Sequence, residues 1–181
     1  MRFSSRFLVI FILCFLSVTY IFGTISAFCA ELVKTKPTII SSDKRFEGFS
    51  DGTTLDKKTG LMWMSKDYWQ MEHKWVNWYT ANEYAQRMNN KKFAGRNDWR
   101  LPTAKEASSL YERRKRNTDK DGDKIFTDRV FPEGAGWSTW TKEEKQSKAI
   151  IVSFKDEGGK SYQNKITATD AFLRLVCGPL P

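Results

Sequence analysis

Two stretches of the chain combine a helix-capping residue with apolar side chains at helical spacing. Thr80 and Thr103 each precede a glutamate by three residues, which is the spacing of a capping box. Pro102, which lacks an N–H, lies just before the second cap and favours an extended residue ahead of it. Apolar residues then fall on one face of each segment, at Ala81, Tyr84, Ala85 and Met88 and at Ala107, Leu110 and Tyr111. The pattern predicts helices over residues 80–90 and 103–116.

Other apolar positions follow strand patterns. Gly60 ends a polar turn between two short apolar runs, where it can supply the positive φ of a hairpin turn. A later run is rich in β-branched side chains and is followed by a glycine-containing turn. Strands are predicted over residues 53–55, 61–64, 149–154, 161–164 and 171–177. This order of elements predicts an α+β fold with two capped helices and antiparallel β-hairpins or sheet.

The first 30 residues have the layout of a secretory signal peptide. Arg2 and Arg6 precede an apolar run over residues 7–22, and small residues follow before the chain becomes polar. The alternative is an uncleaved membrane anchor, since about 20 apolar residues can span a bilayer. We therefore expect an exported protein, periplasmic or extracellular, that would touch a membrane only through this segment.

The rest of the chain is expected to form one domain. Residues 31–44 are polar and lack periodicity, which predicts a linker, and residues 45–181 are long enough to bury a core. Only one of the three cysteines, Cys177, lies in this domain, so no disulfide framework is expected. A bridge to Cys29 would require signal cleavage before that residue. We expect Cys177 to be a small buried side chain.

The composition is basic, with 30 Lys and Arg against 21 Asp and Glu and a net charge of +9. Such a balance favours polyanionic partners. Because export argues against nucleic acid, the expected partner is an acidic polysaccharide or another component of the cell envelope. The alternative is that the charge serves solubility alone.

Two groups of basic residues lie near the second predicted helix, one in the loop before it, at residues 91–96, and one at its end, at residues 113–116. A third group, at Lys142, Lys145 and Lys148, lies further along the chain. If the clusters converge, they form a polyanion-binding surface. In the alternative, the run at 113–116 complements the dipole at the end of the predicted helix. The candidate polyanion-binding residues are Lys91, Lys92, Arg96, Arg113, Arg114, Lys115 and Arg116.

Oxygen-bearing side chains alternate after the second predicted helix, around a glycine. This pattern suits a hard cation, and the candidate calcium ligands are Asn117, Asp119, Asp121, Asp123 and Asp128. Lysines at positions 120 and 124 and the preceding basic run oppose a cation. The favoured interpretation is therefore a solvated acidic turn that pairs with its basic neighbours, and calcium is the only candidate cofactor.

The aromatic residues offer candidate sugar contacts, whereas catalysis has little support. Three of the seven tryptophans, Trp69, Trp75 and Trp140, are candidates to be exposed and to stack on sugar rings, although packing in the core or at its rim is the favoured interpretation for each. His73 is the single histidine, and no nucleophile, zinc or phosphate-loop motif accompanies it. We expect a protein that is not an enzyme.

Several motifs occur in a fixed order: Asp51-Gly52-Thr53, Thr59-Gly60-Leu61-Met62-Trp63, Asp98-Trp99-Arg100-Leu101-Pro102-Thr103 with Glu106, and Trp137-Ser138-Thr139. Together they resemble the Lcl C-terminal domain family. The resemblance implies a C-type-lectin-like α+β fold and an exported binding or adhesion role. The Arg-Leu-Pro-Thr element is also similar to formylglycine-generating enzymes, whose reactive centre needs a cysteine pair that the domain lacks.

The sequence therefore predicts an exported, noncatalytic binding domain that engages acidic glycans or another envelope component. Two alternatives remain: a degenerate relative of formylglycine-generating enzymes, and a structural subunit of an envelope or appendage assembly. The oligomeric state is left open.

Overall fold

Short antiparallel strands form the framework of the computed structural model, which describes residues 36–155 and 158–178. One sheet has five strands in the order β1-β2-β3-β4-β10, a second has three in the order β7-β8-β9, and β5 and β6 pair separately. The first sheet contains β1 (Ile39–Ile40), β2 (Phe46–Gly48), β3 (Thr53–Asp56), β4 (Leu61–Met64) and β10 (Val176–Cys177). The others contain β5 (Asn117–Thr118), β6 (Lys124–Ile125), β7 (Ser138–Lys145), β8 (Lys148–Ser153) and β9 (Lys160–Asn164).

The hairpin predicted around Gly60 is present as β3 and β4. Asp56 organises the turn, because its side chain accepts the Lys58 N–H at 3.0 Å and its carbonyl accepts the Gly60 N–H at 2.8 Å. Gly60 has a φ of +74°, as the turn requires. The strand predicted over 149–154 and its return strand are also present, as β8 and β9.

The stretch predicted as a linker is folded in its described part. Ile39 and Ile40 form β1, which pairs antiparallel with β2, so the folded part begins before residue 45. The predicted signal peptide and residues 31–35 lie outside the described residues. In the part of the chain that the structure describes, no helix is long and apolar enough to cross a membrane.

Three α-helices, α2 (Tyr68–Glu72), α3 (Trp78–Asn90) and α4 (Ala104–Ser109), and the 3-10 turn η1 (Phe93–Gly95) are described. Helix α2, which begins at a capping box of Asp67 and Gln70, was not predicted from the sequence. The predicted start of α3 was too late, because Asn77 and not Thr80 caps that helix. The second predicted helix is correctly capped by Thr103 but ends at Ser109 instead of Arg116.

The early end of α4 has a tertiary cause. Two residues beyond its C-cap, Leu110, the Glu112 N–H donates to the Phe126 carbonyl at 2.8 Å, and the Glu112 carboxylate binds Arg45. These contacts draw the chain away from the helix axis. The basic run at 113–116 therefore lies in a loop, so the prediction that it complements a helix dipole is wrong.

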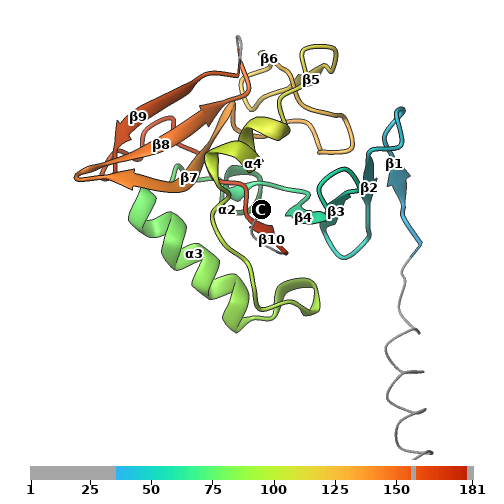
Figure 1. Cartoon of the computed structure of the whole chain (residues 1–181), viewed down its shortest axis with the longest axis horizontal. Helices are drawn as coiled ribbons and strands as arrows, with labels where there is room; N and C mark the ends of the chain where they lie inside the picture. Colours follow the sequence, from blue (N-terminus) through green and yellow to red (C-terminus); the bar gives the residue numbers. More distant parts are fainter. Residues whose placement is uncertain (1–35, 156–157, 179–181) are drawn as a thin grey trace, which may run out of the picture. The chain divides into compact units, whose positions relative to one another are not determined.

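The core lies on both faces of the three-stranded sheet. Trp140 and Ile151 contribute to a cluster with the apolar face of α3, whereas Val152 contributes to a cluster with α4 and the five-stranded sheet. Figure 1 shows α3 along one side of this sheet and α4 near the centre of the fold. Of the predicted last strand, only Val176–Cys177 is a strand, although residues 171–175 are also buried.

Candidate functional site

The junction between the extended segment that ends at Pro102 and the start of α4 is a structural element. Both terminal nitrogens of Arg100 donate to the Glu106 carboxylate at 2.8 Å, and the Thr103 N–H donates to the same carboxylate at 2.7 Å. Burial would raise the pKa of Glu106, but these hydrogen bonds outweigh it and lower the pKa. The carboxylate is thus fixed in its charged form, and it holds the start of α4 against the preceding extended segment.

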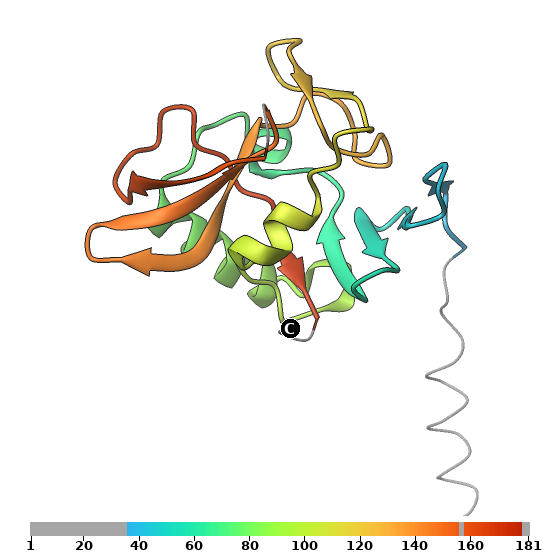
Figure 2. The ribbon, with the colours of Figure 1, turned by 45° about the horizontal axis from the view of Figure 1, so that its top comes forward.

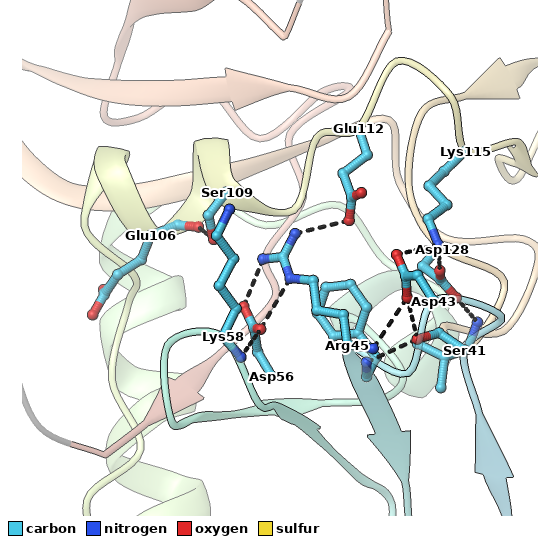
Figure 3. Close-up of polar contacts among 12 residues, drawn as sticks. Ser41, Asp43, Arg45, Asp56, Lys58, Glu106, Ser109, Glu112, Lys115 and Asp128 are labelled. Carbon is cyan, nitrogen blue, oxygen red and sulfur yellow. Dashed lines mark hydrogen bonds and ion pairs between the residues drawn. The ribbon is translucent and has the colours of Figure 1, made fainter.

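The loop after α4 is anchored by cations that each bind two carboxylates (Figure 3). Arg45 donates to Asp56 through two nitrogens, at 3.0 and 2.6 Å, and to Glu112 at 2.8 Å. Burial would lower the pKa of Arg45, but the two carboxylates raise it. This triad ties the loop to β3, and the Asp56 side chain is fully buried.

A second triad involves Lys115, which lies within the basic run. Its ammonium lies 2.8 Å from Asp43 and 2.6 Å from Asp128, and its side chain is 16% exposed. Burial would lower the pKa of Lys115, but hydrogen bonds to Asp128 and Asp43 raise it. The same contacts, with the Ser41 hydroxyl, hold the pKa of Asp43 well below its ordinary value. Lys115 is therefore an internal anchor, which contradicts its predicted place on the polyanion-binding surface.

A third triad occupies the candidate calcium loop. Lys155 lies 2.8 Å from both Asp119 and Asp123. Burial would lower its pKa, but hydrogen bonds to these carboxylates raise it.

The other candidate calcium ligands also have partners within the protein. Asp121 binds Lys120, Asp128 binds Lys115, and Asn117 donates to the carbonyls of Asp128 and Phe131. Over residues 36–155 and 158–178, no three acidic, His or Cys side chains are grouped so that they could hold a metal ion. The geometry is that of an acidic turn bound to lysines.

Five cations next to these triads have no carboxylate partner in the described part of the chain, and we call them the cationic surface: Arg113, Arg114, Arg116, Lys124 and Arg129. All five are exposed. The Arg116 guanidinium lies 4.9 Å and the Lys124 ammonium 4.8 Å from the centre of the Phe126 ring. Arg129 donates to the Arg116 carbonyl at 3.0 Å. The structure thus brings like charges together from three segments.

Among the described residues, the cations of the triads and of the cationic surface together outnumber the carboxylates of the triads. The three triads contain three cations and six carboxylates, and the cationic surface adds five cations, so eight cations exceed six carboxylates by two. The carboxylates are already bound to the buried cations. The exposed guanidinium groups are consequently available to an external anion.

The other predicted basic residues lie elsewhere. Lys91 and Lys92 follow α3, and Arg96 pairs with Asp98 at 3.0 Å. In Figures 1 and 2 the segment after α3 lies well apart from the β5–β6 hairpin. Lys145 and Lys148 flank the β7–β8 turn, at a third place in the fold. The predicted clusters therefore do not converge on one surface.

Two of the three candidate aromatic residues lie together. Trp69 and Trp75 have ring centroids 6.1 Å apart, and the Lys120 ammonium lies 5.0 and 5.9 Å from those centroids. Trp75 is 42% exposed, whereas Trp69 is half-buried. The prediction for Trp140 is wrong: it is fully buried in the core, where its indole N–H donates to the Val76 carbonyl at 2.7 Å.

Helix α2 is held in place by polar contacts to a distant loop. The Asp67 carboxylate accepts the Gly136 N–H at 2.6 Å, and the Gln70 amide donates to the Pro132 and Glu133 carbonyls at 3.0 and 2.8 Å. Burial raises the pKa of Asp67, although Arg174 opposes this shift. These contacts fix the helix that carries Trp69.

Lys120, Lys124 and Arg129 were not predicted from the sequence as parts of these surfaces. Lys120 and Lys124 were considered only as groups that oppose calcium. The sequence did hold a signal, because a lysine in a short strand or turn can bind the face of a nearby aromatic ring. The sequence could not show which aromatic ring each lysine faces, since that depends on how the β5–β6 hairpin packs.

The architecture is mixed α and β with antiparallel sheets, and an anchored loop bears cations that have no carboxylate partner in the described part of the chain. The Lcl C-terminal domain model matches residues 52–177, and the chain belongs to this family. Membership suggests an extracellular or envelope domain. The chain matches no curated protein and no solved structure.

Proposed function

We propose that the protein is an exported, noncatalytic binding domain that engages an acidic glycan through the cationic surface. The observation that carries the proposal is a group of five exposed cations that have no carboxylate partner among the described residues, two of which, Arg116 and Lys124, lie over the Phe126 ring. The fold is proposed to be C-type-lectin-like, which the antiparallel sheets and the family membership support.

The chemistry of the surface favours a polyanion. Four of the five cations are arginines, whose planar guanidinium groups bind carboxylate and sulfate oxygens in pairs and remain charged at every physiological pH. Like charges held close together repel, and a bound polyanion relieves this repulsion while it gains attraction to each group. The ion-pair triads beneath the loop keep these cations together without neutralising them.

Export is part of the proposal because it decides which polyanion the domain meets. The apolar run at residues 7–22 and the basic residues before it support a signal peptide, and the family supports an envelope location. In that compartment acidic polysaccharides are accessible and nucleic acid is not the expected partner. Calcium is not required, since Lys155 and Lys115 bind the acidic turn.

The test replaces two arginines of the cationic surface and two matched lysines elsewhere. Arg113→Gln/Arg114→Gln should weaken binding to dextran sulfate about tenfold at low salt, because each lost charge contributes about 0.5–1 kcal/mol. Lys91→Gln/Lys92→Gln removes the same charge from exposed residues away from this surface and should have a much smaller effect. Titration by isothermal calorimetry at two salt concentrations measures both, with neutral dextran as the uncharged ligand.

The proposal fails if the folded protein does not bind dextran sulfate at low salt. It also fails if the two double variants lose affinity equally, since net charge alone would then explain binding.

A further inference from the structure

We propose that Trp75, with Trp69 beside it and Lys120 over both rings, is a subsite that stacks on one pyranose ring of the acidic glycan. This inference deepens the proposed function, because it names a contact to a sugar ring, which a polyanion without rings cannot make. It rests on the aromatic pair and not on the cationic surface, so the two can be tested separately.

The indole of Trp75 is exposed to solvent, and the indole of Trp69 lies beside it. Trp75 is 42% exposed, and its ring is tilted 33° from that of Trp69. The Trp69 ring is held edge-on by Phe172, at a centroid distance of 6.4 Å. Phe172 is 1% exposed, so the platform rests on the core.

Lys120 positions the two rings. Its ammonium lies within 6 Å of both centroids, a distance at which cation–π attraction operates. The lysine is itself fixed, because its N–H donates to the Ala135 carbonyl at 2.9 Å and its ammonium binds both Asp121 oxygens at 2.8 Å. Little side-chain freedom therefore remains to be lost when a ligand binds.

The chemistry of this surface suits a sugar ring with a negative substituent. An indole face is apolar and matches the C–H face of a pyranose, while the nearby cations favour an anionic group. Lys74, next to Trp75 in the chain, is exposed and has no ionic partner in the described residues. Met71, 43% exposed on α2, adds apolar surface.

The β5–β6 hairpin connects this subsite to the cationic surface. Lys120, in its turn, lies over Trp69 and Trp75, whereas Lys124, in β6, lies over Phe126. Figure 2 shows α2, in teal, near this hairpin. One extended polysaccharide chain could therefore place a ring on Trp75 and an anionic group on the cationic surface.

The experiment compares a polyanion that has sugar rings with one that has none. The probes are oligogalacturonate and inorganic polyphosphate, each titrated into the wild-type protein and into Trp75→Ala. The matched control is Tyr79→Ala, which removes a 49% exposed aromatic ring outside the platform. Trp75→Ala should weaken oligogalacturonate binding about tenfold and leave polyphosphate binding unchanged.

A second variant tests the positioning role of Lys120. Lys120→Met keeps most of the side-chain length but removes the ammonium. It should weaken oligogalacturonate binding and change the near-ultraviolet circular dichroism of the tryptophans, because the rings lose their fixed orientation. Urea unfolding of each variant confirms that the protein is folded.

The inference is overturned if Trp75→Ala and Tyr79→Ala weaken oligogalacturonate binding equally, or if Trp75→Ala weakens polyphosphate binding as much as oligogalacturonate binding. No effect of Trp75→Ala on either probe also overturns it. The role of the cationic surface is tested separately, because Arg113→Gln/Arg114→Gln should weaken binding of both probes. If that double variant has no effect while the Trp75 result holds, the proposed function fails at the cationic surface and the ring subsite stands.

Discussion

Replacement of Lys115 by methionine tests whether the ion-pair triads stabilise the loop that carries the cationic surface. Methionine retains the length and apolar part of the side chain and removes the charge. Asp128, whose side chain is 6% exposed, then loses its cation, and Asp43, 41% exposed, loses the same partner. Arg113→Met is the matched control, because it removes from the same loop an exposed cation that has no carboxylate partner among the described residues.

The expected loss comes mainly from the buried carboxylate. Removal of one partner of a buried ion pair costs about 3 kcal/mol, whereas an exposed pair contributes about 0.5 kcal/mol. Lys115→Met should therefore lower the free energy of unfolding by about 3 kcal/mol, which corresponds to a fall in Tm of about 9 °C for a domain of this size. Arg113→Met should change it by less than about 0.5 kcal/mol.

The pH dependence of this difference follows from the pKa shifts. The folded pKa of Asp43 is lowered, so its contribution is present above the unfolded value of about 3.9 and is lost as the pH falls through the folded pKa. The folded pKa of Lys115 is raised, so its contribution is present below the unfolded value of about 10.4 and is lost as the pH rises through the folded pKa. The difference between wild type and Lys115→Met should thus be greatest between about pH 5 and 10.

Urea unfolding followed by tryptophan fluorescence measures these free energies. The reasoning is refuted if Lys115→Met and Arg113→Met are equally stable, or if the destabilisation by Lys115→Met is as large at pH 2 as at pH 7.

Two further predictions concern buried positions in the core. In Gly136→Ala the new Cβ would lie 2.0 Å from the Phe172 ring, which should cost about 3 kcal/mol by urea unfolding. Gly134→Ala, with a φ of +85° and no atom within 4 Å, should cost only about 1 kcal/mol from backbone strain, and an equal loss would argue against the clash. Burial raises the pKa of Cys177 to about 12, so iodoacetamide should leave this thiol unmodified at pH 8 until the protein unfolds. Mass spectrometry of the Cys177 peptide measures this, and rapid modification of the native protein would contradict its buried position.

The Gly60 hairpin and the Thr103 cap form as predicted, because their hydrogen bonds join residues three or four apart. The local caps at Asp67 and Asn77 were overlooked, so α2 was missed and α3 was started too late. Two other wrong assignments arose where distant residues intervene. β1 forms because β2 offers a pairing edge, and α4 ends early because Arg45 and Phe126 bind Glu112.

The same distinction between local and tertiary information applies to the candidate site. The presence of many unpaired cations could be predicted from composition, but not which of them were unpaired. Lys115 and Arg113 stand two positions apart in one basic run, yet one is an internal anchor and the other is exposed. Trp75 and Trp140 were given the same role, although Trp140 lies on the strand face that α3 covers.

The sequence by itself determined most of the order of elements, the capped start of α4, the basic charge and the family of this protein. Each of these depends on residue identity and near neighbours along the chain. Only the tertiary structure decided which charges were neutralised and which aromatic rings reached solvent. The physical reason is that an ion pair or a buried ring depends on partners such as Asp43 for Lys115 or Val76 for Trp140, whose distance in space cannot be derived from their separation in sequence.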